Sequence, residues 1–269
     1  MIIVPVGGGL GNQFFQYALG RRLAIVNKAD VKFQIPVYKQ NYYRNYCLKY
    51  FNTIENIADE KEIEEMKKRC YISEKYFHFN KEILNLQGDA YLQGYWQSEK
   101  YFKDIEEVIR QEFTLKNKSS LPNVEMATKI QNCNSISLHI RRGDYLWVPN
   151  SIIKELYSLE YYHNAANIIA SSIDEPQFFI FSDDMEWVKQ NLKLKYKMTF
   201  VDINDNDKNY EDLNLMSLCK HHIIANSTFS WWGAWLGKNN SKIVIAPRNW
   251  FNNKDMNTSD LIPESWIRI

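Results

Sequence analysis

Two adjacent arginines, Arg141 and Arg142, lie in the motif His-Ile-Arg-Arg-Gly-Asp-Tyr at positions 139–145, directly after an apolar run typical of a buried strand. Guanidinium groups stay charged and bind phosphate in a planar, bidentate way. Two of them beside Gly143 at a strand end are costly unless they meet an anion. We interpret the pair as a binding site for a phosphate-bearing ligand, with a surface ion pair to Asp144 as the alternative.

A glycine-rich segment at positions 7–13 follows the apolar run 2–6 and opens an expected helix. Glycines allow the backbone to approach a ligand closely, and helix N-terminal amides suit anionic or polar groups. The segment lacks the dinucleotide-binding fingerprint, because Phe14 occupies the place of its third glycine. A tight strand–helix turn without a ligand is the alternative.

Polar side chains also follow two further expected strands. Asp183 and Asp184 come after Ser182, where they suit either capping of a helix N-terminus or a hydrogen bond to a ligand. The stretch 226–230, Asn-Ser-Thr-Phe-Ser, offers hydroxyls and amides that suit phosphate oxygens, and one of them is also expected to cap a helix.

The chain also contains a pattern associated with metal binding. Asp205 and Asp207 match the D-x-D pattern with which many sugar transferases hold a divalent metal. They lie in a run of Asn, Asp and Lys, a composition typical of a solvated turn. We favour the turn and expect no metal site, since paired arginines neutralise a pyrophosphate without one.

The elements that position these residues alternate regularly between strand and helix, which predicts parallel, doubly wound α/β sheets. Ligands of such sheets bind at the carboxyl ends of the strands, where the motifs lie. The expected strands are 2–6, 31–35, 90–93, 135–140, 178–181, 199–201, 223–225 and 243–246. The expected helices are 12–27, 59–69, 99–113, 160–173, 183–192, 211–221 and 230–237.

The segment 116–122, Lys-Asn-Lys-Ser-Ser-Leu-Pro, is the most linker-like part of the chain. It predicts two domains, residues 1–121 and residues 122–269, with a cleft between them. A length of 269 residues suits two modest Rossmann-like domains.

Composition excludes several classes of protein. The 33 basic and 32 acidic side chains give a net charge of +1, so no overall field favours nucleic acid or an anionic membrane. Aromatic residues make up 14% of the chain, which suits sugar-stacking surfaces or a large aromatic core. Because Trp231 and Trp232 are adjacent in an expected helix, they cannot both face a core at one helical angle, and we expect at least one to be core.

The compartment is expected to be the cytoplasm. The four cysteines form no C-x-x-C pair, so we expect reduced thiols and no zinc site. The apolar N-terminus runs into glycines without a basic region before it, which is unlike a signal peptide. No apolar run reaches the length of a membrane span, although peripheral contact with the inner face of the membrane is left open.

The motifs together resemble the bacterial alpha-1,2-fucosyltransferases of glycosyltransferase family 11. The resemblance rests on the glycine-rich segment with its following Phe-Phe-Gln-Tyr, the arginine motif, Phe-Ser-Asp-Asp, and Asn-Ser-Thr-Phe-Ser-Trp-Trp-Gly-Ala-Trp-Leu. The segment 93–102 also resembles sequences of this family. The H-x-R-R-x-D pattern is shared with other fucosyltransferases, so it specifies a GDP-fucose donor better than it specifies a linkage.

The resemblance implies a GT-B-type fold, with two Rossmann-like domains facing a central cleft, and no required cofactor or metal. The N-terminal domain would be mainly on the acceptor side and the C-terminal domain would bind the donor. The implied activity is transfer of L-fucose, with inversion, from GDP-beta-L-fucose to the 2-hydroxyl of a terminal galactose. The acceptor would be an oligosaccharide or a lipid-linked glycan. One alternative is a fucosyltransferase of other linkage or acceptor. The others are a non-catalytic carbohydrate- or nucleotide-binding module, and a metal-dependent transferase that uses Asp205 and Asp207.

The resemblance also assigns roles to residues. The residues implied for catalysis are Arg141 and Arg142, which would hold the pyrophosphate, with Asp144 as the candidate base or as a group that orients an arginine. Asp212 would read the guanine, with Glu211 as the alternative. The resemblance implies further donor contacts for Gly11, Asn12, His139, Ser227 and Thr228. Asp183 is a further donor-binding candidate because of its place after a strand, and the acceptor candidates are Trp96, Gln97, Tyr145 and Trp147.

Overall fold

The computed structural model describes residues 1–35, 45–143, 158–251, 253 and 256–269. The chain forms two compact units. The first comprises Met1–Asn117 and Asn257–Pro263, and the second comprises Lys118–Met256 and Glu264–Ile269. The division therefore falls four residues before the expected boundary, and a segment near the C-terminus belongs to the first unit.

The expected linker ends in a helix that the sequence did not predict. Helix α4 (Leu121–Gln131) begins after Ser120, with Pro122 in its first turn. Proline suits this position because the first amides of a helix have no intrahelical partner. Ser119 donates a hydrogen bond to Glu211 at 2.7 Å, so the residues before α4 already belong to the second unit.

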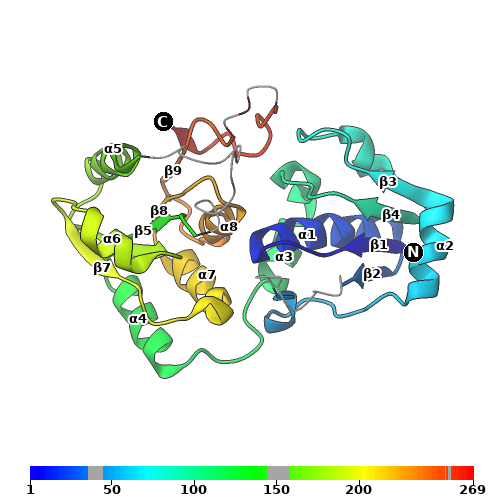
Figure 1. Cartoon of the computed structure of the whole chain (residues 1–269), viewed down its shortest axis with the longest axis horizontal. Coiled ribbons are helices and arrows are strands. Elements are labelled where there is room, and N and C mark those ends of the chain that lie inside the picture. The colour runs from blue at the N-terminus through cyan, green and yellow to red at the C-terminus, as the bar shows by residue number, and fades with distance from the viewer. Residues whose placement is uncertain (36–44, 144–157, 252, 254–255) are drawn as a thin grey trace. The chain divides into compact units, whose positions relative to one another are not determined.

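The first unit contains a four-stranded parallel sheet in the order β2-β1-β4-β3 (Figure 1). Its central strands, β1 and β4, are neighbours: the chain steps from β1 outward to β2, crosses to β3 at the other edge, and returns to β4 beside β1. Because the strands are parallel, the carboxyl ends of β1 and β4 lie side by side at one edge of this sheet. The strands are β1 (Ile2–Pro5), β2 (Val31–Gln34), β3 (Tyr71–Ser73) and β4 (Ala90–Gln93).

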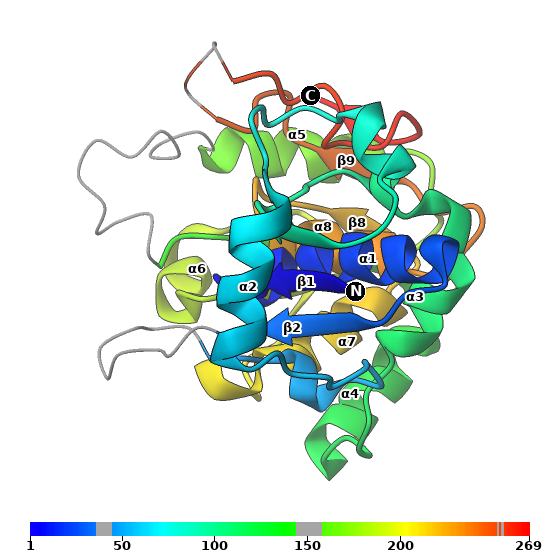
Figure 2. The same cartoon turned by 90° about the vertical axis from the view of Figure 1, so that its right-hand side faces the viewer.

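Two helices cover the faces of this sheet. The side chain of Val4 comes so close to Gly20 of α1 (Leu10–Asn27) that a Cβ there would lie 2.5 Å from it. Ile3 points to the opposite face and packs in a core cluster with residues of α2 (Glu60–Cys70). Figure 2 looks onto α2, which crosses in front of β1 and β2. Glycine at position 20 thus permits the close approach of α1 to the strand.

The predicted helix 99–113 was wrong in its first half. Short 3-10 turns occupy Glu99–Tyr101 and Lys103–Ile105, and α3 spans only Glu106–Glu112. Ser98 caps the first turn with its side chain. Local side-chain hydrogen bonds of this kind compete with a continuous helix.

The second unit contains a six-stranded parallel sheet in the order β10-β9-β8-β5-β6-β7. From β5 the chain moves outward through two strands and then returns to the other side of β5, which is the strand order of a dinucleotide-binding sheet. The switch point lies between β5 and β8. The strands are β5 (Asn134–Ile140), β6 (Pro176–Ser182), β7 (Lys197–Phe200), β8 (His221–Ile223), β9 (Val244–Ala246) and β10 (Ile267–Arg268).

Helices lie on both faces of this second sheet. Side chains of α4 and of α7 (Asn209–Leu218) share one core cluster, and α7 also packs against α8 (Thr228–Leu236). Side chains of α5 (Leu159–Ala170) and α6 (Met185–Asn191) share the cluster on the other face. Most expected strands and helices occur within about three residues of their predicted bounds, whereas the three-residue β3, the two-residue β10 and α4 were missed.

Helix α8 is buried on all sides, which changes the expectation for its tryptophans. Trp231 and Trp232 are both fully buried, so the prediction that at least one is core is confirmed and exceeded. Trp231 lies 5.5 Å from Trp266 between ring centroids and parallel to Trp235 at 6.1 Å. The two adjacent side chains point in different directions, and each is surrounded by other residues of the protein.

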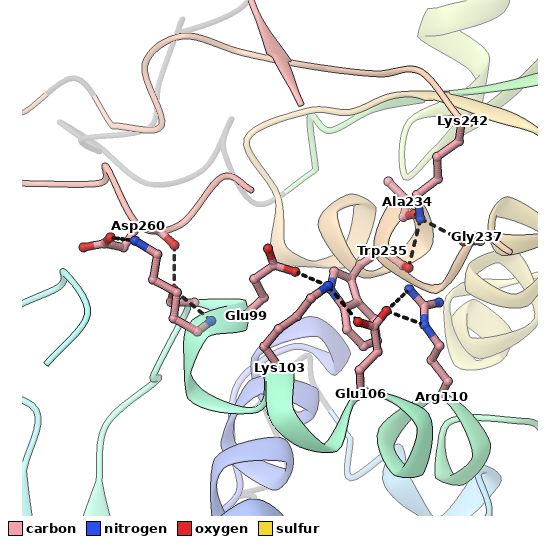
Figure 3. A network of polar contacts seen from close by, with 11 residues as sticks. Glu99, Lys103, Glu106, Arg110, Ala234, Trp235, Gly237, Lys242 and Asp260 are labelled. Carbon is pink, nitrogen blue, oxygen red and sulfur yellow. Dashed lines mark hydrogen bonds and ion pairs between the residues drawn. The ribbon is translucent and has the colours of Figure 1, made fainter. Parts of the chain in front are cut away.

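A lysine closes the C-terminal end of α8. Lys242 donates from Nζ to the carbonyl oxygens of Ala234 at 2.8 Å, Trp235 at 3.1 Å and Gly237 at 2.8 Å (Figure 3). The last carbonyls of a helix lack intrahelical partners and carry partial negative charge, which an ammonium group neutralises. Lys242 therefore stabilises α8, the helix that begins at Thr228.

We expect Lys242→Met to lower the free energy of unfolding by about 1–3 kcal/mol, because it leaves helix-end carbonyls without their charged donor. Urea denaturation measures the change. Lys238→Met, at a nearby exposed lysine, is the control and should change stability by less than about 0.5 kcal/mol. Equal effects of the two substitutions would show that Lys242 has no special role.

Candidate active site

The switch point of the six-stranded sheet brings two of the predicted motifs together. Arg141 and Arg142 follow β5, and the stretch 226–228 follows β8, which is hydrogen-bonded to β5. Parallel neighbours end at the same edge of a sheet, so both motifs lie at its carboxyl edge. This is the place where sheets with this strand order bind their ligands.

An aspartate from the neighbouring strand fixes the arginine pair. Asp183 follows β6, and its Oδ2 lies 2.7 Å from Nη1 of Arg141. Its Oδ1 accepts a hydrogen bond from the backbone N–H of Arg142 at 2.8 Å. Asp183 was predicted to contact the donor, and the contacts seen here are to the arginines. The expected alternative, a pair with Asp144, concerns a residue outside the described part.

Arg142 is held in two ways through its side chain. Its Nε donates to Oδ2 of Asp184 at 3.0 Å, and its Cζ lies 3.6 Å from the ring centroid of Trp187. Asp184 is itself fixed, because its side chain caps α6. The stacking on Trp187 and the ion pair with Asp184 fix the plane of the guanidinium group. Both involve Cζ and Nε, so the terminal amino groups can donate hydrogen bonds to a ligand. A preorganised, bidentate donor of this type suits phosphate.

Gly143 makes the ion pair of Arg141 sterically feasible. A Cβ at this position would lie 2.4 Å from Oδ2 of Asp183. We expect Gly143→Ala to displace the Asp183 carboxylate and to lower enzymatic activity at least about tenfold, while the fold is retained. Steady-state kinetics together with circular dichroism check this, and wild-type rates in Gly143→Ala would contradict it. Gly88→Ala, where φ is +78° and a Cβ meets nothing within 4 Å, is the comparison: it strains the backbone without displacing a side chain, so it should leave the activity unchanged.

His139, the residue before the end of β5, provides an uncharged polar group. Its side chain is buried, and Nδ1 has no hydrogen-bond partner among the described residues. Burial lowers the pKa of His139 to about 4, with Asp183 opposing the shift and Arg141 adding to it. The imidazole is therefore neutral near pH 7 and available to a ligand.

The N-terminus of α8 presents hydroxyl groups at the same edge. Ser227 is the N-cap residue but makes no capping hydrogen bond through its side chain. Ser230 instead donates to the carbonyl of Ser227 at 3.1 Å. The side chain of Asn226 has a structural partner, because its Nδ2 donates a hydrogen bond to the carbonyl of Trp250 at 3.2 Å. The N-terminal amides of α8 and the positive end of its dipole suit an anion.

The two neighbouring acids of α7 differ in their surroundings. Glu211 is 6% exposed and accepts a hydrogen bond from the hydroxyl of Ser119. Asp212 accepts a hydrogen bond from Nδ2 of Asn204 at 2.8 Å, and Asn204 exchanges two amide hydrogen bonds with Asn123. Burial raises the pKa of Asp212 to about 7, and the charges of Glu211, Asp202 and Asp205 add to the shift.

In the first unit, the predicted residues of the glycine-rich segment meet the segment after β4. Oδ1 of Asn12 accepts a hydrogen bond from Nε2 of Gln97 at 2.9 Å. Gly8 has a φ of +77°, where glycine is favoured. Gln13 donates to the carbonyl of Gly8 at 2.9 Å. The side chain of Trp96 is only 1% exposed, so little of its ring surface is accessible to an acceptor.

Three candidate site residues, Asp144, Tyr145 and Trp147, lie outside the described part of the chain, so their roles stay predictions. Asp205 caps the 3-10 turn Asn206–Lys208 with its side chain, as the interpretation of this run as a solvated turn expects. Across the described ranges, no group of three or more His, Cys, Asp or Glu side chains is arranged to hold a metal ion.

The sequence motifs missed three groups that shape the two sheet edges. Trp187, Asn204 and Glu74 lie outside every motif, although Trp187 follows Asp184 by three residues, the spacing at which side chains meet on a helix. Asn204 lies in a run already interpreted as a solvated turn. Glu74 follows β3, which is too short to show a pattern.

The profile of glycosyl transferase family 11 matches residues 1–269 of the chain. The protein belongs to this family. An alpha-1,2-colitosyltransferase of Escherichia coli is 35% identical over 100% of this chain and 99% of its own length. The O-antigen biosynthesis glycosyltransferase WbnK of Escherichia coli is 30% identical over 98% and 99%. Human galactoside alpha-(1,2)-fucosyltransferase 1 is 28% identical over 64% of this chain and 48% of its own.

Solved structures similar to this family 11 glycosyltransferase show the same fold. NodZ alpha-1,6-fucosyltransferase co-crystallized with GDP has a TM-score of 0.54 at 12% identity and covers 86% of this chain and 90% of its own. ADP-heptose heptosyltransferase II of Escherichia coli has a TM-score of 0.51 at 11% identity, covering 100% and 89%. The predicted α/β fold of the GT-B type is confirmed. Within the described ranges, this family 11 member has no helix apolar and long enough to cross a membrane.

Proposed function

We propose that the protein is an inverting fucosyltransferase that moves L-fucose from GDP-beta-L-fucose to the 2-hydroxyl of a terminal galactose. The observation that carries the proposal is the arginine pair at the β5–β8 switch point, anchored by Asp183 and Asp184. Two guanidinium groups fixed side by side at a sheet edge suit the oxygens of a diphosphate, which accept planar, bidentate hydrogen bonds. The family and the alpha-1,2-linkage in the names of two relatives support the choice of reaction.

The donor would bind along the carboxyl edge of the six-stranded sheet. Arg141 and Arg142 would hold the diphosphate, with Ser227 and Thr228 at the α8 N-terminus contributing hydroxyl and amide donors. Asp212 would read the guanine, because its carboxylate ionises near pH 7 and accepts hydrogen bonds. His139 would donate or accept a hydrogen bond as a neutral group. Asp183 would act by orienting the arginines.

The chemical step would be a direct displacement. A hydroxyl of the acceptor attacks the anomeric carbon of fucose, the bond from that carbon to the diphosphate oxygen breaks, and GDP leaves. Negative charge grows on the leaving diphosphate, and fixed arginines stabilise it more in the transition state than in the ground state. The base that takes the acceptor proton is proposed as Asp144. No cofactor and no metal would be required.

A second candidate is transfer of colitose, because a relative that matches the whole chain at 35% identity is an alpha-1,2-colitosyltransferase. Colitose differs from L-fucose in lacking the 3-hydroxyl. A site that hydrogen-bonds this hydroxyl discriminates strongly against the deoxy sugar, whereas a site that ignores it does not. The two functions therefore share the diphosphate and guanine contacts and differ only at the sugar.

The test compares donors on the wild-type enzyme. GDP-fucose, GDP-colitose, UDP-galactose and ADP-heptose are each offered with lactose, and nucleoside diphosphate release and product are measured. We expect product with GDP-fucose and a lower kcat/KM with GDP-colitose. The reverse order would favour the colitosyltransferase. No product with either GDP donor over a wider panel of galactosides would contradict both proposals.

A further inference from the structure

The first unit holds a partly buried carboxylate that no predicted motif contains. Glu74 follows β3, and its Oε2 accepts a hydrogen bond from the backbone N–H of Tyr95 at 2.7 Å while its Oε1 accepts one from Trp96 at 3.0 Å. Burial raises the pKa of Glu74, and the two backbone hydrogen bonds oppose the rise. A carboxylate that binds two successive amides fixes the turn after β4.

The same turn is also fixed by α1. Gln16 of this helix donates to the carbonyl of Gly94 at 3.1 Å and accepts the backbone N–H of Gly7 at 2.9 Å. Glycine is required at position 94, because a Cβ would lie 2.5 Å from Cβ of Glu74. Gln16 therefore ties the turn after β4 to the glycine-rich segment after β1, and both lie at the carboxyl ends of neighbouring parallel strands.

The backbone of this turn is strained in a way that aims its side chains. Trp96 has a φ of +58°, a left-handed conformation that costs energy for a side chain of its size. The result is a buried Trp96, packed edge to face on Tyr101 at 5.8 Å, and a Gln97 that reaches Asn12. The two hydrogen bonds that Glu74 accepts from the backbone N–H groups of Tyr95 and Trp96 stabilise the strained conformation.

Tyr95 is the residue that this arrangement leaves outside. Its side chain is 47% exposed, although its backbone N–H is anchored by Glu74. An exposed ring with a polar tip on a fixed backbone is a low-entropy surface for binding, because little freedom is lost when a ligand contacts it. It follows the carboxyl end of β4, and ligands of open parallel sheets bind outside the carboxyl ends of the strands.

We propose that Tyr95, not Trp96, is the ring on which the acceptor sugar stacks, and that Glu74 is the positioning residue that aims it. The proposal rests on the glycosyltransferase function proposed above and names a determinant of its acceptor site. The ligand is a galactose-terminated glycan, whose ring carries an apolar face of C–H groups. Glu74 acts through the backbone of Tyr95 and Trp96 and touches no substrate.

The experiment measures the KM for lactose and the KM for GDP-fucose separately. Tyr95→Ala is expected to raise the KM for lactose about tenfold, and Tyr95→Phe to stay within about twofold of the wild type, since the ring face is kept. Glu74→Gln replaces one acceptor by a donor facing an N–H and is expected to raise the same KM about fivefold. The KM for GDP-fucose is expected to change less than about twofold in each variant.

The matched control is Tyr76→Ala, which removes a more exposed tyrosine, 65% exposed, from the same unit. Its two KM values should equal those of the wild type. If Tyr95→Ala leaves the lactose KM unchanged while the wild type transfers fucose, the stacking role is overturned. If Glu74→Gln lowers kcat or thermal stability without raising that KM, Glu74 is merely structural. If the wild type transfers no sugar to any galactoside, the proposed function fails, and the acceptor role of Tyr95 fails with it.

Discussion

Arg142→Lys is expected to lower the rate of sugar transfer by on the order of 100–1000-fold with little change in stability. A lysine keeps the charge but loses the planar group that stacks on Trp187 and binds Asp184 through Nε. Its ammonium group would turn to Asp184 and leave the diphosphate with one cation. Pre-steady-state transfer from GDP-fucose, with donor hydrolysis measured in parallel, gives the rate of the chemical step.

The control is Arg69→Lys, at an exposed arginine of the first unit whose partner is Asp89. It should leave both rates within about twofold of the wild type. Full activity in Arg142→Lys would contradict the diphosphate role. A large loss that appears only in the KM for the donor would show that Arg142 binds the ground state and the transition state equally.

Asp212→Asn is expected to weaken GDP binding about 10–100-fold, because a charged acceptor is lost and an amide donor faces the donors of guanine. Inosine diphosphate lacks the 2-amino group, so the wild type should bind GDP more tightly than inosine diphosphate, and the variant should lose this preference. Isothermal titration with both nucleotides measures the ratio. Loss of the preference in Glu211→Gln but not in Asp212→Asn would reassign guanine recognition to Glu211.

The pH dependence of this variant has a defined sign. The pKa of Asp212 is about 7 in the folded protein and about 3.8 in the unfolded chain, so the folded state binds the proton more tightly. The group therefore lowers the stability of the wild type progressively as the pH rises through this window. Asp212→Asn should be more stable than the wild type above about pH 7 and no more stable below about pH 4. GDP affinity of the wild type should rise with pH up to about 7.

The sequence predicted the parallel sheets and the strand ends that carry the site, because alternating periodicity and glycine-rich turns are local signals. It placed Arg141, Arg142 and Ser227 in separate motifs but contained no sign that β8 would return beside β5. Strand order depends on long-range packing, and the switch point follows from it. The helix α4 was hidden because its first residues resemble a linker.

The sequence also could not predict the roles of residues whose partners lie far away along the chain. Asp183 looked like a cap or a ligand contact, and the structure shows it bridging both arginines across 41 residues or more. Trp96 was predicted to contact the acceptor, yet its left-handed backbone turns the ring into the core and leaves Tyr95 exposed. Neither orientation is encoded by residue type.

Linkage mapping tests most directly whether the protein transfers a GDP-linked 6-deoxy sugar to the 2-hydroxyl of galactose. The wild-type enzyme is incubated with GDP-fucose and a panel of beta-galactosides, and the product is examined by NMR. We predict one new alpha-anomeric fucose on the 2-position of the terminal galactose, with an equal amount of GDP released. A beta-linked product, attachment at another hydroxyl, or release of GDP with no glycoside formed would contradict the proposed function.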